Sequence, residues 1–124
     1  MRQKLLIGIV DDDEIVRDTT KDLLESAGFS AASFASAESL LESSQLNQLA
    51  CLIADMRMPG MSGLALHQQL VARNHSIPTI LVSAYLDERM GALALKERVV
   101  GCLSKPFAAE ELLAHVRRAL RRHR

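Results

Sequence analysis

The sequence is poor in aromatic residues and cysteine, and each shortage narrows what the chain can be. It has no tryptophan, one tyrosine and three phenylalanines in 124 residues. With so few flat side chains, recognition of nucleic-acid bases by stacking is not expected. Cys51 and Cys102 have neither CxxC nor metal-ligand spacing and lie in apolar runs, so we expect two buried free thiols.

The chain also lacks a long hydrophobic run and an excess of charge of either sign. No apolar stretch approaches the roughly 18 residues that a membrane span needs, and the run after residues 1–4 is too short for a signal peptide. Fifteen basic and fifteen acidic residues cancel, so net charge points neither to nucleic acid nor to a membrane. We therefore expect a cytoplasmic protein that binds no membrane.

What the sequence does have is a regular alternation of short apolar runs and amphipathic stretches. The apolar runs predict buried strands, at residues 5–10, 30–34, 49–54, 77–82 and 99–103. Helices are expected over residues 14–27, after the N-cap Ser36, after Gly63, over 88–97 and over 108–122. Successive βα units of this kind predict an α/β fold, a doubly wound parallel sheet with right-handed crossovers and helices on both faces.

Polar side chains follow four of the predicted strands, at the point where each strand ends. They are Asp11, Asp12 and Asp13, then Asp55, then Ser83, and finally Ser104 and Lys105. A parallel sheet brings the carboxyl ends of its strands to one edge, so we expect these groups to converge. Clustered carboxylates repel unless a cation neutralises them, and oxygen ligands favour Mg²⁺. A carboxylate beside Mg²⁺, a lysine and a hydroxyl is suited to attack phosphorus and form an aspartyl phosphate.

Each of these residues also has a plainer interpretation. Asp13 is better explained as the N-cap of the helix that follows it. Asp11 and Asp12 could be solvated turn residues, Ser83 a turn hydroxyl and Lys105 a surface charge. Together, however, the plainer interpretations require several independent coincidences at one edge of the sheet, and we favour a shared site.

Four motifs, in this order and at these separations, resemble a known family: "IVDDDE", "LIADMRMPGMSG", "ILVSAY" and "LSKPF". They are similar to the receiver domain of bacterial two-component response regulators, and "DMRMPGMSG" followed by "KPF" is most similar to the FixJ/NarL type. The resemblance covers essentially all of residues 1–124 and implies a single receiver domain. Its fold would be flavodoxin-like, as in CheY, with five strands in the order 2-1-3-4-5. The resemblance favours a fragment of a longer regulator, whose output domain lies outside this chain, over a stand-alone regulator.

The resemblance also implies a role for individual residues. Asp55 is the implied phosphoacceptor. Asp11, Asp12, Asp55 and the backbone carbonyl of Arg57 would hold Mg²⁺, or Mn²⁺ in its place. Lys105 would contact the phosphoryl group. The resemblance also implies that Ser83 binds a phosphoryl oxygen and begins the conformational change.

Three further positions concern the conformation of the chain and its change. Pro106 is implied to follow a cis peptide bond, which would aim the preceding lysine inward. Cys102 stands where the family often has Phe or Tyr, and a thiol is too small to act as that aromatic switch. Tyr85 is then either a substitute switch residue or simply a partly exposed loop residue. Arg98 stands where glycine is usual, and positive φ costs a non-glycine residue roughly 1 kcal/mol or more. Either Arg98 is strained or this loop is rebuilt.

The implied function is a phosphorylation-dependent signalling switch and not a metabolic enzyme. The domain would take phosphate from a sensor histidine kinase and catalyse only its own phosphotransfer and dephosphorylation. Its partner surface would comprise the helix over 88–97, the following strand and the last helix. This surface would contact a second copy of the domain and control a transcriptional output domain. The domain itself would not bind nucleic acid directly. A pseudo-receiver scaffold is the alternative, although it would normally lack the acceptor or the lysine. A Mg²⁺-dependent aspartyl-phosphate phosphatase would place Asp where Arg57 stands.

Overall fold

The computed structural model describes residues 5–84 and 87–122. Five parallel strands form one sheet in the order β2-β1-β3-β4-β5, as predicted. The strands are β1 (Leu6–Val10), β2 (Ser30–Phe34), β3 (Leu49–Asp55), β4 (Thr79–Ser83) and β5 (Gly101–Ser104). The helices are α1 (Glu14–Ser26), α2 (Ala37–Leu41), α3 (Gly63–Ala72), α4 (Glu88–Lys96) and α5 (Ala109–Arg122), with one turn of 3-10 helix at Leu46–Gln48.

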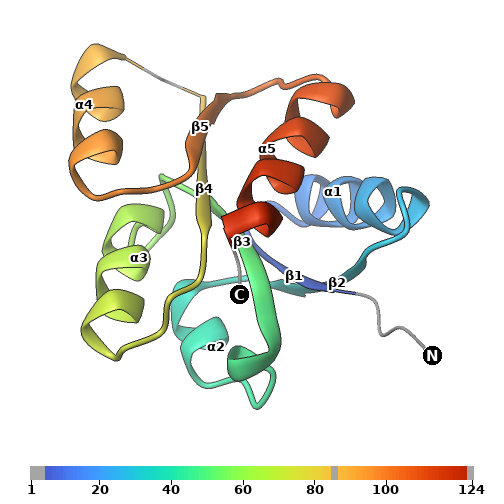
Figure 1. Ribbon diagram of the computed structural model, residues 1–124, viewed down its shortest axis with the longest axis horizontal. Helices are drawn as coiled ribbons and strands as arrows, with labels where there is room; N and C mark the ends of the chain where they lie inside the picture. Colours follow the sequence, from blue (N-terminus) through green and yellow to red (C-terminus); the bar gives the residue numbers. More distant parts are fainter. Residues whose placement is uncertain (1–4, 85–86, 123–124) are drawn as a thin grey trace.

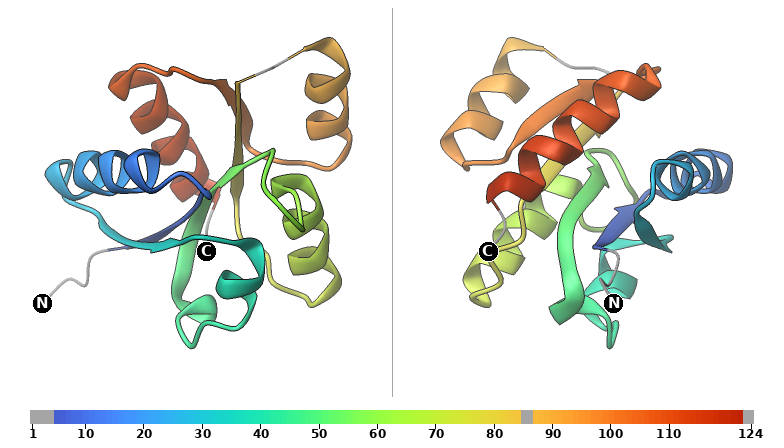
Figure 2. Two further views of the ribbon diagram at one scale, coloured as in Figure 1. Left: turned by 180° about the vertical axis from the view of Figure 1, so that it is seen from behind. Right: turned by 45° about the vertical axis from the view of Figure 1, so that its right-hand side comes forward.

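Helices cover both faces of the sheet (Figure 1). Helices α1 and α5 lie on one face, and α2, α3 and α4 lie on the other, as the two further views in Figure 2 also show. Successive side chains of a strand point to opposite faces. In β3, Cys51 and Ile53 therefore pack with the α1–α5 core, while Leu52 and Ala54 pack with the other core. All seven residues of β3 are buried, which explains why this strand reads as an unbroken apolar run.

Every strand boundary lies within two residues of the one predicted, and the larger differences have a physical reason. Strand β4 begins at Thr79 and not at residue 77, because Pro78 has no N–H to donate to a neighbouring strand. Strand β5 begins at Gly101, since Val99 is still engaged with the end of α4: its N–H donates to the carbonyl of Ala94 at 3.1 Å. Strand β3 includes Asp55, which was expected just beyond it.

Helix α1 begins where the sequence predicted and ends at Ser26, one residue earlier than expected. The side chain of Asp13 accepts hydrogen bonds from the N–H groups of Ile15 and Val16 at 2.9 and 3.3 Å, so Asp13 is the N-cap. Gly28, with a φ of 96°, follows the last turn. The N–H of Gly28 and that of Phe29 return to carbonyls of the last turn, a capping motif that needs positive φ at its turning residue.

Helix α4 ends in the same motif, but with Arg98 at the turning position. The φ of Arg98 is 61°. Its N–H donates to the carbonyl of Leu95 at 3.2 Å, and the N–H of Val99 donates to that of Ala94. The loop is therefore not rebuilt: arginine occupies the left-handed conformation that glycine would occupy without strain.

The two cysteines are free and differ in burial. Cys51 is fully buried, and burial raises the pKa of its thiol to about 12, so it stays protonated and unreactive. Cys102 is only half-buried, because β5 is an edge strand that pairs with β4 alone. The prediction of two buried thiols is confirmed for Cys51 and wrong for Cys102. Within residues 5–84 and 87–122, no helix has the length and apolar character needed to cross a bilayer.

The strain at Arg98 predicts a gain in stability on substitution. Arg98→Gly removes the Cβ that disfavours positive φ, and we expect the free energy of unfolding to rise by up to about 1 kcal/mol. Arg98→Ala keeps the Cβ and is the matched control, for which we expect no such gain. Urea unfolding of the three proteins measures the difference. An equal gain in both variants would show that the arginine side chain, and not the backbone, is the source of strain.

Candidate functional site

Four strand ends bring the predicted site residues to one edge of the sheet. Asp11 directly follows β1, Asp55 ends β3, Ser83 ends β4 and Lys105 follows β5. Carboxylate oxygens of Asp11, Asp12 and Asp55 all lie within 4.8 Å of one another. Ser83 is 1% exposed and pairs in register with Ser104, while its neighbour Val82 pairs with Asp55. The clustering predicted from the strand ends is therefore present.

Lys105 connects the two buried carboxylates of this cluster. Its Nζ lies 2.9 Å from Oδ2 of Asp11 and 3.2 Å from Oδ2 of Asp55. Its main-chain N–H donates to the carbonyl of Ser83 at 2.8 Å, and the Lys105–Pro106 peptide bond is cis. Burial by itself would lower the pKa of Lys105, but the hydrogen bonds and charges of Asp11 and Asp55 outweigh it and raise that pKa. The ammonium therefore stays charged at neutral pH.

Asp55 is held in a place that disfavours its own charge. It is 7% exposed, and burial is the main reason that its pKa is raised. The negative charge of Asp11 raises that pKa further, while the Arg57 N–H and Lys105 lower it. The N–H of Arg57 donates to Oδ1 of Asp55 at 3.2 Å. Both carboxylate oxygens of Asp55 therefore accept a hydrogen bond, Oδ1 from the Arg57 N–H and Oδ2 from Lys105.

The turn sequence "MPGMSG" ends in a glycine that the site requires. A Cβ on Gly63 would lie 2.6 Å from the carbonyl oxygen of Asp55. Only a residue without a side chain lets the first turn of α3 approach the end of β3 so closely. Ser62 caps the helix, its Oγ accepting from the N–H of Ala65 at 3.1 Å. These two residues place α3 directly behind Asp55.

Arg17 contributes to the site although it does not stand at a strand end, and it was not identified from the sequence. Nη1 of Arg17, from the first turns of α1, donates to the carbonyl oxygen of Asp11 at 2.7 Å. The N–H of Asp13 donates to Oδ1 of Asp11 at 2.9 Å. A cation four residues after Asp13, on the helix that Asp13 caps, was the available signal. Together these contacts fix the backbone and the side chain of Asp11.

The remaining predicted residues are placed as follows. Asp13 caps α1 and does not belong to the carboxylate group. The Arg57 side chain is exposed. Cys102 lies within β5 and packs against the core under α2, α3 and α4, away from the strand ends. Tyr85 lies outside the described residues.

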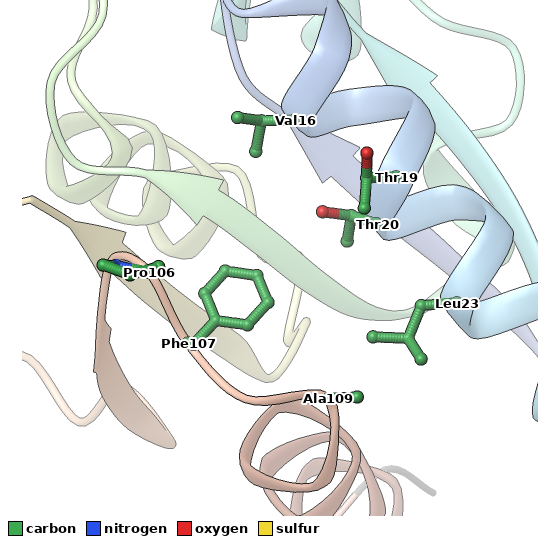
Figure 3. A pocket seen from close by; sticks show the side chains of 7 residues that line it. All are labelled: Val16, Thr19, Thr20, Leu23, Pro106, Phe107 and Ala109. Atoms are coloured by element: carbon green, nitrogen blue, oxygen red, sulfur yellow. The ribbon is translucent and has the colours of Figure 1, made fainter.

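An apolar hollow of about 340 Å³ lies beside the carboxylates, between α1 and the segment that leads from β5 to α5 (Figure 3). Its lining residues are Val16, Thr19, Thr20, Leu23, Pro106, Phe107 and Ala109. Val16, Thr20 and Phe107 also line a much smaller cavity that reaches Asp11 and Asp55. A surface suited to an apolar partner therefore adjoins the acidic group.

Comparison with known families decides what this geometry represents. Residues 7–117 match the family described as the response regulator receiver domain. The chain belongs to this family. The receiver domain is 40% identical to the response regulator protein TodT of Pseudomonas putida, over 94% of this chain and 51% of TodT. It is 38% identical to the C4-dicarboxylate transport transcriptional regulatory protein DctD of Rhizobium meliloti, over 94% of this chain and 25% of DctD.

Solved structures agree with this assignment. The crystal structure of FixJ-N matches with a TM-score of 0.88 at 31% identity, covering 98% of this chain and 97% of that one. The response regulator StyR matches with a TM-score of 0.88 at 39% identity, covering 96% of this chain and 60% of StyR. The receiver domain spans about half, or less, of the length of the curated relatives TodT and DctD. The family resemblance and strand order expected from the motifs are confirmed.

The raised pKa of Asp55 predicts how stability changes with pH. The folded receiver holds this proton more tightly than the unfolded chain does, so its stability falls as pH rises from the ordinary pKa of aspartate through the raised one. Asp55→Asn removes the charge, and we expect its free energy of unfolding to exceed that of the wild type at neutral pH. The difference should shrink below the ordinary pKa. Urea titrations in EDTA at neutral and acidic pH measure it.

A variant less stable than wild type at neutral pH would contradict this expectation. It would mean that the ion pair of Asp55 with Lys105 contributes more than burial of the carboxylate costs. Asp22→Asn is a suitable control, because Asp22 is exposed on α1.

Proposed function

We propose that the receiver domain is a phosphorylation-dependent switch that accepts a phosphoryl group on Asp55 from a sensor histidine kinase. The observation that carries this proposal is the meeting of Asp55 with Asp11, Asp12 and the Lys105 ammonium at the carboxyl edge of the sheet. Asp55 is the carboxylate at the centre of these contacts, and both Lys105 and the Arg57 N–H hold it. The exchange would take place in the cytoplasm.

The proposed transfer makes Asp55 the nucleophile. An oxygen of its carboxylate forms a bond to phosphorus while the bond from phosphorus to the kinase imidazole nitrogen breaks, and that imidazole keeps the electron pair. Lys105 then sits beside the oxygens of the new acyl phosphate and balances part of their charge. Ser83, buried at the end of the adjacent strand, would donate its hydroxyl proton to one of those oxygens. Dephosphorylation would be a separate step, in which water attacks phosphorus, the bond from phosphorus to the Asp55 oxygen breaks, and the free carboxylate and inorganic phosphate are released.

The donor set fits a divalent cation of the Mg²⁺ type. The three clustered side chains supply hard carboxylate oxygens, which Mg²⁺ and Mn²⁺ prefer. Three carboxylates against the Lys105 ammonium leave a charge of −2 that a divalent ion would balance. We propose that Asp11, Asp12, Asp55 and the carbonyl of Arg57 hold it. When bound, the ion would neutralise charge on the carboxylates and on the transferring phosphoryl group.

Two surfaces are proposed to meet partners. The apolar hollow beside the carboxylates (Figure 3), together with Ile15, which is 77% exposed at the start of α1, would contact the kinase as it approaches Asp55. The surface of α4, β5 and α5 would carry the output, including homodimerisation. Leu93 and Leu95 on α4 support this, because they are 38% and 82% exposed. We propose that the full-length protein carries a transcriptional output domain, as the names of relatives such as DctD suggest.

Incubation with acetyl phosphate and Mg²⁺, followed by intact mass measurement, tests the acceptor. We expect one phosphate adduct on the wild type, none on Asp55→Asn, and none when EDTA replaces Mg²⁺. Asp12→Asn replaces a charged metal ligand by a neutral one. Since the loss of an outer-shell partner alone typically costs about ten-fold or more in metal affinity, we expect the adduct of this variant to need at least about ten-fold more Mg²⁺. Asp13→Ser preserves a helix cap and is the matched control, expected to behave like the wild type.

The outcomes distinguish the alternatives. An adduct that persists in Asp55→Asn would place the acceptor elsewhere. No adduct on the wild type, with either acetyl phosphate or a kinase as donor, would favour a protein-binding scaffold. Steady turnover of a phosphomonoester would instead favour a phosphatase.

Cys102 provides a test of the output surface. Cys102 is half-buried in β5, at a position where the family often has an aromatic residue. An aromatic side chain there should couple phosphorylation more strongly to the conformation of the α4–β5 face. We expect Cys102→Phe to change the fraction of dimer formed after phosphorylation, measured by sedimentation velocity with and without acetyl phosphate. Cys102→Ser is the control of similar size to the native residue. Identical dimerisation in all three proteins would count against a role for this position.

A further inference from the structure

A buried histidine on α3 contacts the end of α4, far from the phosphoacceptor. His67 is 6% exposed and lies among the apolar residues of α3 that face the sheet. Its Nε2 is 2.8 Å from the carbonyl oxygen of Glu97, the residue that caps the C-terminus of α4. Its Nδ1 is 3.1 Å from Oγ1 of Thr79, which is 0% exposed at the start of β4. One ring therefore joins α3, α4 and β4.

The proton on Nε2 is required by its partner. A carbonyl oxygen only accepts, so Nε2 must donate to Glu97. Nδ1 can accept the Thr79 proton when the ring is neutral. When the ring is cationic, Nδ1 can donate to Thr79, whose hydroxyl then donates to the carbonyl of Ile77 at 3.0 Å. The bond from His67 to Glu97 is present in either case.

The capping motif of α4 does not bind the carbonyl of Glu97, and the hydrogen bond from His67 does. The final carbonyls of a helix have no partner within it. The N–H groups of Glu97, Arg98 and Val99 return to the carbonyls of Leu93, Leu95 and Ala94. The carbonyl of Glu97 itself is bound by His67. The imidazole thus binds a further carbonyl at the end of α4, immediately before the strained Arg98.

Helix α4 has little else to hold it. The structure describes every residue of α4, and among them only Ala94 is buried, whereas α3 buries five. A hollow of about 560 Å³ opens between the ends of α3 and α4, and His67, Val71, Lys96 and Arg98 are among the residues that line it. Packing therefore does not fill the space between these helix ends, and the hydrogen bond spans it.

We propose that His67 is a positioning residue that fixes the C-terminal end of α4, so that α4 moves about this end when the domain is phosphorylated. The second part rests on the function proposed above. The end of α4 that His67 holds lies near the start of β4, because His67 also contacts Thr79, the first residue of that strand. Asp55 lies at the other end of the strands, next to Ser83, the last residue of β4. The N-terminal end of α4, capped by Asp87, is the end nearer to Ser83 in the chain. Movement would then be largest near Asp87 and smallest at Glu97.

Hydrogen exchange of single backbone amides in the resting protein tests the positioning role. In His67→Leu, the amides of Glu97, Arg98 and Val99 should exchange roughly five-fold faster, the equivalent of one ordinary hydrogen bond. The same motif at the end of α1, with the amides of Ala27 to Phe29, is an internal control and should not change. His67→Gln can still donate an amide N–H to Glu97 and should restore slow exchange.

Thr79→Val removes only the second partner of the ring and should leave the three α4 amides close to the wild type. Unchanged exchange in His67→Leu would overturn the proposal. Equal acceleration at the ends of α1 and α4 would overturn it as well, since it would mean that His67 supports the whole fold and not one helix end.

Exchange after phosphorylation with acetyl phosphate and Mg²⁺ tests the second part. In the wild type, the change should be confined to the first turn of α4, near Met90, and in His67→Leu it should extend to Glu97. A wild-type change at Glu97 equal to that at Met90 would contradict movement about this end. If mass measurement finds no phosphate on the wild type, the proposed function fails, while exchange in the resting protein still decides the role of His67.

Discussion

The paired contacts of Lys105 with Asp11 and Asp55 are the constraint on which the rest of the site depends. They join residues 94 and 50 positions apart in the chain. Two like unit charges roughly 4 Å apart repel by roughly 4 kcal/mol at an effective dielectric constant of about 20, so two buried carboxylates would not both stay ionised at this edge without a cation. The ammonium makes the arrangement possible, and it leaves the surplus negative charge that a divalent ion would balance.

The local sequence around each strand end serves this one contact. Gly63 allows α3 to begin against the carbonyl of Asp55, and Arg17 and the Asp13 N–H fix Asp11 from the opposite side. The backbone of Lys105 is bound to Ser83, so that the lysine cannot move independently of β4. The carboxylates are therefore held in position in the resting protein, which would lower the cost of arranging them during the proposed transfer.

The sequence predicts those features that follow directly from the alternation of strands and helices. Asp55 and Lys105 could be assigned to one edge because each stands at the end of a strand, and parallel strands end together. Asp13 could be separated from its neighbours because a cap has a fixed place before a helix. The contact of His67 with Glu97 could not be predicted, since it depends on how α3 and α4 lie against each other across 30 residues. The half-burial of Cys102, by contrast, follows from β5 being an edge strand, which the expected strand order already implied.

The unequal packing of the helices sets where a conformational change can occur. Asp11, Asp55 and Lys105 are each held by two or more hydrogen bonds, whereas α4 buries one residue among those described, from Glu88 to Lys96. An acyl phosphate on Asp55 would carry a charge of about −1.5 to −2 in place of the single charge of the carboxylate, and such a change can shift an equilibrium only between states of similar free energy. The element with the least burial is the one for which two positions can be close in free energy. A single hydrogen bond at one end of α4 then has a large effect on the direction in which the helix moves, because it limits which positions the helix can reach.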